Sequence, residues 1–374
     1  MNKTLDQFLG CLIGGAVGDA LGYAIEFWDE GTIFRKYGKK GITHYNLYNG
    51  KTIVSDDTQM SLFTANGLLN VATQNQSSDF DLSYREGIRL AYQDWYRTQM
   101  APLRSPIHEI GNTWIFQAPA LHYWRAPGGT CLNALERGGH GRIDQPLNRS
   151  KGCGGVMRVA PIGLYFYKSL PEAMRVGAEA AALTHGHELG YLPAAMLSYM
   201  VGYLVQDSNH TIEQATYKAL EEIDILFSQS FHLQEFKDLM NQAISLSTSN
   251  LPDLKAIHEL GEGWVGEEAL AIALYCALKH ANDFESGIVA AVNHKGDSDS
   301  TGAIAGNILG AHLGLQAIPP YFIESLDVKD LLFELGYDLY EGVPKQEDKP
   351  LREEAWNHKY LFHDYLKTLN SLGR

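Results

Sequence analysis

Four glycines recur at every fourth position of the first apolar segment, and their spacing restricts how this chain can fold. Gly10, Gly14, Gly18 and Gly22 lie within residues 5–24, where larger apolar residues recur at three- and four-residue steps. Steps of that size place the glycines along one face of an amphipathic helix. Because glycine is a poor helix former, a whole stripe of it indicates that another helix or a ligand approaches this backbone closely.

Helical periodicity continues through most of the chain, whereas the alternating patterns typical of strands are scarce. Besides residues 5–24, we expect helices over 57–72, 82–98, 131–137, 171–185, 189–206, 211–228, 233–247, 266–281, 283–293, 300–313 and 328–339. Loops are expected at 27–54 and 101–130, where Gly, Pro, Tyr and Trp are mixed. The sequence therefore predicts a single compact all-α domain across residues 1–374.

The composition is that of a folded, acidic protein. Hydrophobic residues make up 45% and charged residues 20% of the 374, so a sizeable core can form. The formal net charge of −14 argues against sequence-independent binding to nucleic acid, which relies on basic surface. An anionic substrate stays possible, provided that bound metal supplies positive charge locally.

The cysteines and the N-terminus both favour a cytoplasmic protein. The four cysteines form no CxxC pair and are widely spaced, at Cys11, Cys131, Cys153 and Cys276. We expect them to be reduced. Asp19 interrupts the apolar N-terminal run, which favours a folded helix over a targeting peptide. No apolar stretch is long enough for a membrane span, and we expect a monomer without a membrane partner.

Two aspartates stand one residue apart in "GDSDST", at the head of a helix rich in glycine and alanine. A helix cap would explain one of them, because a cap needs one acceptor, and negative charge suits a helix N-terminus. However, all five residues from Asp297 to Thr301 carry side-chain oxygens, and Asp299 is among them. Hard cations such as Mg²⁺, Mn²⁺ or Ca²⁺ prefer such ligands.

A second acidic cluster has the same arrangement 240 positions earlier (297 minus 57). In "SDDTQM", Ser55 precedes Asp56 and Asp57 at the head of another apolar helix. If the two helix heads face each other, four carboxylates meet, and such a site needs cations to neutralise it. Two divalent ions about 3.5–4 Å apart are a known catalytic arrangement. From spacing alone, two independent helix caps on unrelated faces stay the alternative.

These clusters belong to a longer ordered set of motifs. The set comprises "GGAVGDALG" (14–22), "SDDTQM" (55–60), "RAPGGTCLNAL" (125–135), "SKGCGGVMRVAPIGL" (150–164), "THGH" (184–187) and "GDSDSTGAIAGNILGA" (296–311). It resembles the ADP-ribosylglycohydrolases, the group that includes the dinitrogenase reductase-activating glycohydrolase. The resemblance covers roughly residues 8–340, which leaves a C-terminal helical extension.

The resemblance implies a compact orthogonal multi-helix fold with two divalent cations, Mg²⁺ or Mn²⁺, in a central dinuclear cleft. The implied reaction is hydrolysis of the glycosidic bond between ADP-ribose and a modified group. The implied metal ligands are Ser55, Asp56, Asp57, Asp297, Asp299 and Ser300. Serine stands at 55 and at 300 where relatives often carry threonine, and both residues keep an oxygen ligand.

Two acids are implied as catalytic residues. Glu26 matches the acidic residue after the first glycine helix, which the family associates with the metal site and with substrate exchange. Glu109, in "HEIGNT", stands where relatives often carry aspartate, and its expected role is to position or activate a water. Asp94 is a rival for that role, although we expect it to be a surface acid on a helix.

The glycine-rich stretch "SKGCGGVMR" suits a diphosphate, because glycines let successive backbone N–H groups point into one concavity. By resemblance, the substrate-binding residues are Lys151, Gly152, Cys153, Gly154, Gly155, His185 and Arg125. Cys153 replaces the asparagine of some relatives, and we interpret it as lining the pocket because no base partner stands out. His187 is a second histidine within reach of the substrate, and Glu188 replaces a frequent proline.

Together these features predict a metal-dependent hydrolase that removes ADP-ribose from a protein side chain or a small conjugate, with the arginine linkage favoured. Three alternatives stay open. They are a protein that binds ADP-ribose without hydrolysis, an immunity factor that reverses the action of a toxin, and a hydrolase of ADP-ribosylated nucleic acid. The acidic composition disfavours the last, and the six retained oxygen ligands favour an enzyme.

Overall fold

The computed structural model describes residues 4–77, 81–100, 111–345 and 350–366. Its α-helices are α1 (Leu5–Tyr23), α2 (Glu30–Tyr37), α3 (Asp56–Ser77), α4 (Tyr84–Met100), α5 (Gly129–Glu136), α6 (Ala160–Tyr165), α7 (Leu170–Ala182), α8 (Glu188–Leu204), α9 (Ile212–Leu226), α10 (Leu233–Ser247), α11 (Asp253–Leu260), α12 (Gly266–Lys279), α13 (Phe284–Val292), α14 (Ser298–Leu313), α15 (Pro320–Glu324), α16 (Lys329–Glu341) and α17 (Pro350–Tyr360). Short 3₁₀ turns are η1 (Trp114–Gln117), η2 (Pro119–Leu121), η3 (Cys153–Gly155) and η4 (Leu315–Ala317). Across these ranges only isolated β-bridges interrupt the helices and loops, so the predicted all-α class is confirmed.

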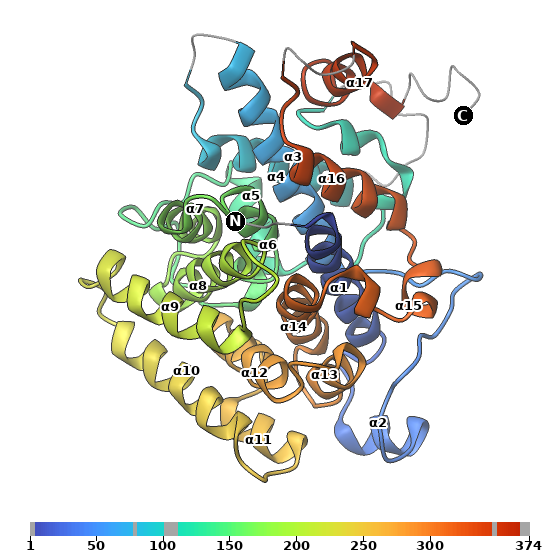
Figure 1. Cartoon of the computed structure of the whole chain (residues 1–374), viewed down its shortest axis with the longest axis vertical. Coiled ribbons are helices and arrows are strands. Elements are labelled where there is room, and N and C mark those ends of the chain that lie inside the picture. The colour runs from blue at the N-terminus through green and yellow to red at the C-terminus, as the bar shows by residue number, and fades with distance from the viewer. Residues whose placement is uncertain (1–3, 78–80, 101–110, 346–349, 367–374) are drawn as a thin grey trace.

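Helices α1 and α14 lie side by side in the middle of the molecule, and their glycines meet (Figure 1). A Cβ atom added to Gly18 would lie 1.9 Å from the carbonyl oxygen of Gly302. One added to Gly14 would lie 2.4 Å from the carbonyl oxygen of Gly306. Real Cβ atoms essentially never come within 3.0 Å of another heavy atom, so side chains here would force the helices apart. The glycine stripe therefore admits a close helical neighbour, as predicted.

This antiparallel pair positions both acidic helix heads. The start of α14 lies beside the end of α1, where the Ser298 hydroxyl donates to the Gly22 carbonyl at 3.2 Å. The start of α3 is attached to α1 by Asp19, whose carboxylate accepts from the backbone N–H groups of Ser55 at 2.9 Å and Thr58 at 3.1 Å. Because α1 contacts both heads, it holds them on the same side of the molecule.

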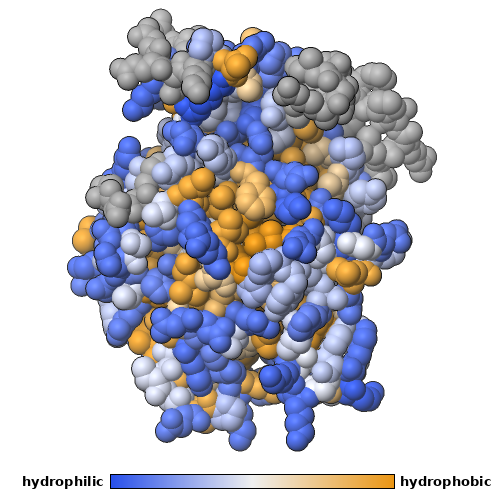
Figure 2. All heavy atoms as spheres, turned by 45° about the vertical axis from the view of Figure 1, so that its right-hand side comes forward, coloured by the Kyte–Doolittle hydropathy of each residue, from blue (hydrophilic) through white to orange (hydrophobic). Residues whose placement is uncertain are grey.

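The remaining helices surround the central pair (Figure 1). Helix α8 contacts α6, α7, α9 and α12, while α3 contacts α4, α6 and α16. Helix α17 packs on α3, where Trp356 Nε1 donates to Thr73 Oγ1 at 2.9 Å. The face shown in Figure 2 is largely hydrophilic at its periphery, with apolar side chains gathered towards its middle.

The structure differs from the sequence prediction where helices are short. The loop predicted over residues 27–54 contains α2, whose first turn is capped by Asp29 through its bond from Thr32 N at 3.0 Å. Gly38, with φ of 82°, ends this helix. Only Ile33 of α2 is buried, so the helix has no apolar stripe from which its period could be recognised.

Three other short helices, α6, α11 and α15, are also absent from the prediction. Residues of α6 from 160 to 164 are all buried, and Pro161 lies in its first turn. A helix that is apolar on every side shows no amphipathic period, which explains why the pattern misses it. Of the loop predicted over 101–130, the described part holds η1, η2 and the first residues of α5.

Three expectations about the whole chain have different outcomes. All four cysteines are free thiols, in line with the prediction. Among the described residues, no helix has the length and hydropathy needed to cross a lipid bilayer. The division into a core of about residues 8–340 and a C-terminal extension stays a prediction.

Candidate metal and substrate site

A cavity of about 350 Å³ opens where the heads of α3 and α14 approach the turn after α1. Five acidic side chains line it, namely Glu26, Asp56, Asp57, Asp297 and Asp299. Among the described residues that line this cavity there is no lysine or arginine. The two acidic clusters, far apart in the sequence, therefore share one strongly negative cleft.

Local hydrogen bonds hold the head of α3 in place. The hydroxyl oxygen of Ser55 accepts from the backbone N–H of Asp57 at 3.2 Å. Asp56 Oδ2 accepts from the backbone N–H of Gly128 at 3.2 Å. Ser55 does not line the cavity itself, but its hydroxyl also hydrogen-bonds Asp299, so it links the two helix heads.

The head of α14 brings two acids close to Glu26. Asp297 is the N-cap of α14, and its Oδ1 accepts from the backbone N–H of Ser300 at 3.4 Å. Asp299 Oδ1 accepts from the same N–H at 3.0 Å. One carboxylate oxygen from each of Glu26, Asp297 and Asp299 lies within 4.8 Å of the others. The three acids are close enough to share one cation.

Burial and mutual repulsion act on all five acids. For Glu26, burial first and the charge of Asp299 second raise the pKa to about 10. The same two causes raise the pKa values of Asp56, Asp57 and Asp297 well above their usual range. Burial also raises the pKa of Asp299. Protonation or bound cations must relieve this repulsion, since unpaired buried charges are very unfavourable.

Two buried oxygens of the cluster fit a metal site. Asp57 Oδ2 and Glu26 Oε2 have no hydrogen-bond partner in the described part of the chain. Buried polar atoms are normally satisfied, so each such exception calls for a partner. Carboxylate and hydroxyl oxygens are the ligands that Mg²⁺ and Mn²⁺ prefer. The residues present therefore fit divalent cations.

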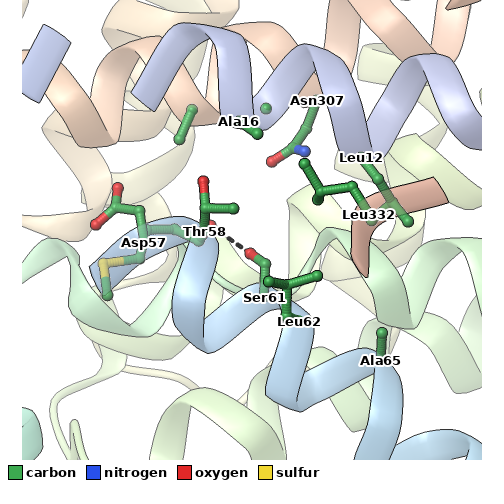
Figure 3. A pocket seen from close by; sticks show the side chains of 12 residues that line it. Leu12, Ala16, Asp57, Thr58, Ser61, Leu62, Ala65, Asn307 and Leu332 are labelled. Carbon is green, nitrogen blue, oxygen red and sulfur yellow. Dashed lines mark hydrogen bonds between the residues drawn. The ribbon is translucent and has the colours of Figure 1, made fainter. Parts of the chain in front are cut away.

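A small interior gap of about 10 Å³ lies behind the acids, between α1, α3, α14 and α16. Figure 3 shows Asp57 at one end of this gap and Leu12 and Leu332 at the other. Ser61, one turn further along α3, donates to the Met157 carbonyl at 3.5 Å. The acids thus lie at the boundary between the apolar core and the open cavity.

A second wall of the cavity comes from the glycine-rich stretch. Gly152, Cys153, Gly154 and His185 all line it. A Cβ atom on Gly154 would lie 2.9 Å from Cys131 Sγ and 3.0 Å from a carbon of the His185 ring. The absence of a side chain there lets the histidine reach the cavity.

Two backbone N–H groups at the start of this stretch are not free donors. The N–H of Gly152 donates to Ser150 Oγ at 3.3 Å, and that of Cys153 donates to the Trp264 carbonyl at 3.3 Å. The first bond is local, whereas the second belongs to a bridge between this stretch and the segment before α12. A concavity built from these two N–H groups is therefore not present.

A contact to Thr184, which is itself hydrogen-bonded to Arg158, holds the His185 ring in place. Its Nδ1 lies 2.8 Å from Thr184 Oγ1, which accepts from Arg158 Nη2 at 2.7 Å. Burial first, and the charge of the buried Arg158 second, lower the pKa of His185 to about 3. A neutral imidazole therefore faces the cavity.

With this geometry in place, comparison with known proteins decides the family. Residues 1–349 match the family model of the ADP-ribosylglycohydrolases. The chain belongs to the ADP-ribosylglycohydrolase family. The resemblance inferred from the ordered motifs is thus confirmed.

Several known proteins are similar to this glycohydrolase along nearly its whole length. It is 26% identical to the ADP-ribosyl-[dinitrogen reductase] glycohydrolase of Rhodospirillum rubrum, over 87% of this chain and 91% of the relative. It is 24% identical to the ADP-ribosylhydrolase ARH3 of Danio rerio, over 92% and 94%. It is 23% identical to the ADP-ribosylarginine hydrolase Tri1 of Pseudomonas putida, over 92% and 81%.

A solved structure supports the fold of the glycohydrolase. The structure is described as an ADP-ribosylglycohydrolase-related protein complex, and it superposes with a TM-score of 0.55 at 23% identity. The match covers 90% of this chain and 98% of that one. The roles of single residues are a separate matter and stay predictions.

Two basic residues predicted to contact substrate lie outside the cavity lining of the glycohydrolase. Arg125 donates to Asp327 Oδ2 at 2.8 Å, and its side chain is almost fully buried in this ion pair. Lys151 forms an ion pair with Glu267 at the start of α12. Neither placement supports a substrate contact, because both cations already have an anionic partner distant in the sequence.

Two further residues of the predicted substrate wall are structural in this glycohydrolase. A Cβ atom on Gly155 would lie 2.7 Å from the Gly190 carbonyl, so Gly155 lets α8 pack closely and does not line the cavity. His187 is the N-cap of α8, where its ring accepts from the backbone N–H of Leu189 at 3.1 Å. Close packing of α8 explains the glycine at 155, and capping of α8 explains the histidine at 187.

The two candidates for water activation have different outcomes. Glu109 lies outside the described residues, so its role stays a prediction. Asp94 is buried, and the expectation of a surface acid is wrong. Its carboxylate accepts from Thr113 Oγ1 at 2.9 Å and Asn112 Nδ2 at 3.0 Å, which ties α4 to the segment before η1. Asp94 does not line the cavity.

Sequence reasoning missed Asp19 and two aromatic residues. Asp19 was used only to argue against a targeting peptide, although a lone acid in an apolar glycine-rich helix is itself a signal of a buried anchor. Phe27 and Trp264 line the mouth of the cavity and stack with their ring centroids 5.9 Å apart. Their side chains come from segments that no local pattern connects.

Proposed function

We propose that this glycohydrolase cleaves the glycosidic bond between ADP-ribose and a modified protein side chain, with arginine the favoured acceptor, and that it requires two divalent cations. The observation that carries the proposal is the cavity with five acids and no basic side chain among its described lining residues. The diphosphate of ADP-ribose is anionic, so such a cavity repels it until cations bind. The similarity to a protein named as an ADP-ribosylarginine hydrolase supports arginine as the acceptor.

The metal ligands in this proposal are Ser55, Asp56, Asp57, Asp297, Asp299 and Ser300. Mg²⁺ or Mn²⁺, when bound, supplies Lewis-acid polarisation and offsets the charge of the carboxylates. Ser300 lines the cavity beside the acids, and Ser55 connects the two helix heads. These short contacts keep the ligands in place before any ion arrives, which lowers the cost of ordering them on binding.

Glu26 is the acid that we assign to proton transfer. Its carboxyl group lies beside Asp297 and Asp299, and its Oε2 is buried without a partner. Once bound cations offset the negative charges that raise its pKa, Glu26 can ionise and take a proton from a water that attacks the anomeric carbon. A carboxylate near the sugar also stabilises the positive charge that develops as the acceptor leaves.

The start of α5, which meets Asp56 through Gly128, suits the diphosphate. The first residues of α5 and its preceding glycine, Gly128, Gly129 and Thr130, line the cavity, and no side chain caps this helix. Unpaired N–H groups at a helix N-terminus favour anions. His185 adds a neutral ring nearby that can donate a hydrogen bond without adding charge.

Release of free ADP-ribose from an ADP-ribosyl-arginine substrate in Mn²⁺ or Mg²⁺ tests the proposal. We expect Asp56→Ala and Asp299→Ala, made separately, each to lower turnover by at least about a hundredfold, since even outer-sphere partners of metals contribute about 10–100-fold. Asp330→Ala is the matched control, because Asp330 also lies in the first turn of a helix but is exposed and outside the cavity. Near-normal turnover in both cavity variants would contradict the proposal.

A panel of ADP-ribosyl-arginine, ADP-ribosyl-serine and ADP-ribosyl-nucleotide substrates determines the linkage. Binding of ADP-ribose without release of product from any of them would favour the non-catalytic alternative. We further propose that the protein is cytoplasmic and monomeric. The four free thiols support the first point, and size-exclusion chromatography tests the second.

A further inference from the structure

A fully buried arginine, Arg158, contacts the residue that precedes His185. Among the described residues this arginine has no carboxylate partner. Its guanidinium donates to the Ala180 carbonyl at 3.1 Å and to Thr184 Oγ1 at 2.7 Å, and it lies 4.3 Å from the centre of the Tyr92 ring. A guanidinium can only donate hydrogen bonds. Thr184 Oγ1 is therefore the acceptor in its bond with Arg158.

The hydrogen of the Thr184 hydroxyl has one good acceptor. His185 Nδ1 lies 2.8 Å from Thr184 Oγ1, whereas the Ala181 carbonyl oxygen lies 3.5 Å away. That carbonyl already accepts from the backbone N–H groups of Thr184 at 3.1 Å and His185 at 2.9 Å, which occupy its two lone pairs. Cys131 Sγ is a weak acceptor and already accepts from Arg158 Nη1 at 3.4 Å. The Thr184 hydroxyl therefore donates to His185 Nδ1.

This bond determines what the His185 ring presents to the cavity. The ring is neutral, because burial and the charge of Arg158 lower its pKa to about 3. In a neutral imidazole, one nitrogen accepts and the other carries the hydrogen. With Nδ1 accepting, the hydrogen is on Nε2, which would lie 3.3 Å from a Cβ atom added to Gly152 of the cavity wall. Nε2 has no hydrogen-bond partner in the described part of the chain, so its N–H is available to a ligand.

We propose that Arg158 and Thr184 are positioning residues, which fix His185 in the tautomer whose Nε2–H donates to a phosphoryl oxygen of ADP-ribose. Neither residue lines the cavity, so both act through the histidine. This inference rests on the proposed function for the identity of the ligand, whereas the tautomer follows from the contacts of the protein itself.

A phosphoryl oxygen is the ligand atom that needs this arrangement. It can only accept, so it requires the Nε2–H and would be repelled by a lone pair on Nε2. A ribose hydroxyl both donates and accepts, and it would bind either tautomer. Because an unpaired buried charge is unfavourable, an anion next to His185 also compensates Arg158.

Nitrogen-15 NMR of the full-length protein, labelled at histidine, reads the tautomer without any substrate. The resonances of His185 are those that disappear in His185→Gln. In the wild type we expect hydrogen on Nε2 and a hydrogen-bonded, unprotonated Nδ1. Thr184→Val should move the Nδ1 resonance towards that of a nitrogen without a hydrogen bond, and Thr184→Ser, which keeps the hydroxyl, should restore the wild-type position.

Titration calorimetry in Mg²⁺ measures the consequence for binding. Thr184→Val should bind ADP-ribose about tenfold more weakly, the lower end for a hydrogen bond to a charged group. ADP should show the same loss, because it keeps the diphosphate. Thr216→Val is the matched control: Thr216 is also buried in a helix, its hydroxyl donates to the Ile212 carbonyl at 2.8 Å, and it lies outside the cavity lining. That variant should leave both the resonances and the affinity unchanged.

Several results would overturn the inference. Hydrogen on Nδ1 of the wild type would exclude the tautomer, and this spectrum needs only wild-type resonances, so a folding defect in Thr184→Val leaves the test intact. An Nδ1 resonance or an ADP-ribose affinity that Thr184→Val does not change would exclude the positioning role. A loss for ADP-ribose but not for ADP would place His185 against the distal ribose. Failure of the wild type to bind ADP-ribose would instead contradict the proposed function, while the spectra still decide the tautomer.

Discussion

The contact between the two glycine stripes provides the sharpest quantitative prediction. In Gly18→Ala, the new Cβ would lie 1.9 Å from the Gly302 carbonyl oxygen, against a practical minimum of 3.0 Å. The helices must therefore separate by at least about 1.1 Å (3.0 minus 1.9). Neither partner can yield locally, because the atom that blocks the methyl group belongs to the helix backbone.

Both stability and activity should respond. Overpacking a well-packed core costs about 1–3 kcal/mol and occasionally more, and we expect Gly18→Ala to reach about 3 kcal/mol because backbone must move. The heads of α3 and α14 both contact α1, so the displacement also separates the two acidic clusters. A misplacement of about 1 Å can cost about a hundredfold in rate, so turnover should fall further than the loss of folded protein explains.

Denaturant unfolding and ADP-ribose release, measured on the same preparations, test this prediction. Gly31→Ala is the control, because Gly31 lies in the exposed helix α2 and its added Cβ would meet only side-chain atoms, at 3.1 Å and beyond. That variant should be neutral or more stable by up to about 1 kcal/mol, the helix propensity difference. A Gly18→Ala protein with wild-type stability and turnover would refute the argument that this contact positions the site.

Three more predictions follow from the same contacts. Asp19→Ala removes the acceptor of the N–H groups at the start of α3, so we expect a loss of about 2 kcal/mol from the free energy of unfolding; an unchanged denaturation midpoint would contradict that anchoring role. Since His185 has a pKa of about 3 when folded, against 6.5 as its ordinary value, the unfolded state binds the proton first and stability falls as pH drops below 6.5. Relative to His185→Gln, the wild type should lose about 2 kcal/mol between pH 7 and pH 5, and parallel unfolding curves would exclude a neutral buried imidazole. Removing divalent cations with a chelator should lower the melting temperature, because saturating ions at about a thousand times their Kd stabilise the folded state by about 4 kcal/mol. In scanning calorimetry, Asp57→Asn should show a smaller change in melting temperature on chelation than the wild type. An equal change in both proteins would place the ions elsewhere.

Much of this site could be predicted from patterns among residues that are close together in the sequence. The three- and four-residue period of apolar positions marks the long helices, and the oxygen-bearing side chains at 55–57 and 297–301 stand out at two helix heads. Period and capping depend on residues within one or two turns of each other. Hence the all-α class, the acidic clusters and the need of the glycine stripe for a close neighbour could be predicted.

Other features depend on contacts between distant parts of the chain. Arg125 and Lys151 look like phosphate ligands from their motifs, but their charges are already paired with Asp327 and Glu267. Asp94 lies on a helix whose buried face is defined only when η1 packs against it. No local pattern reports such partners, because each lies outside the turn or helix that contains the motif.

The sequence by itself determined where the long helices lie, where oxygen ligands gather and which helix must approach a neighbour without side chains. Only the tertiary structure decided that α14 is this neighbour, that Asp19 holds the start of α3, and that Cys153 reaches Asp297. The physical reason is the distance along the sequence over which each effect acts. Helix periodicity arises within a few residues, whereas a buried charge acquires its partner only after the chain has brought distant segments together.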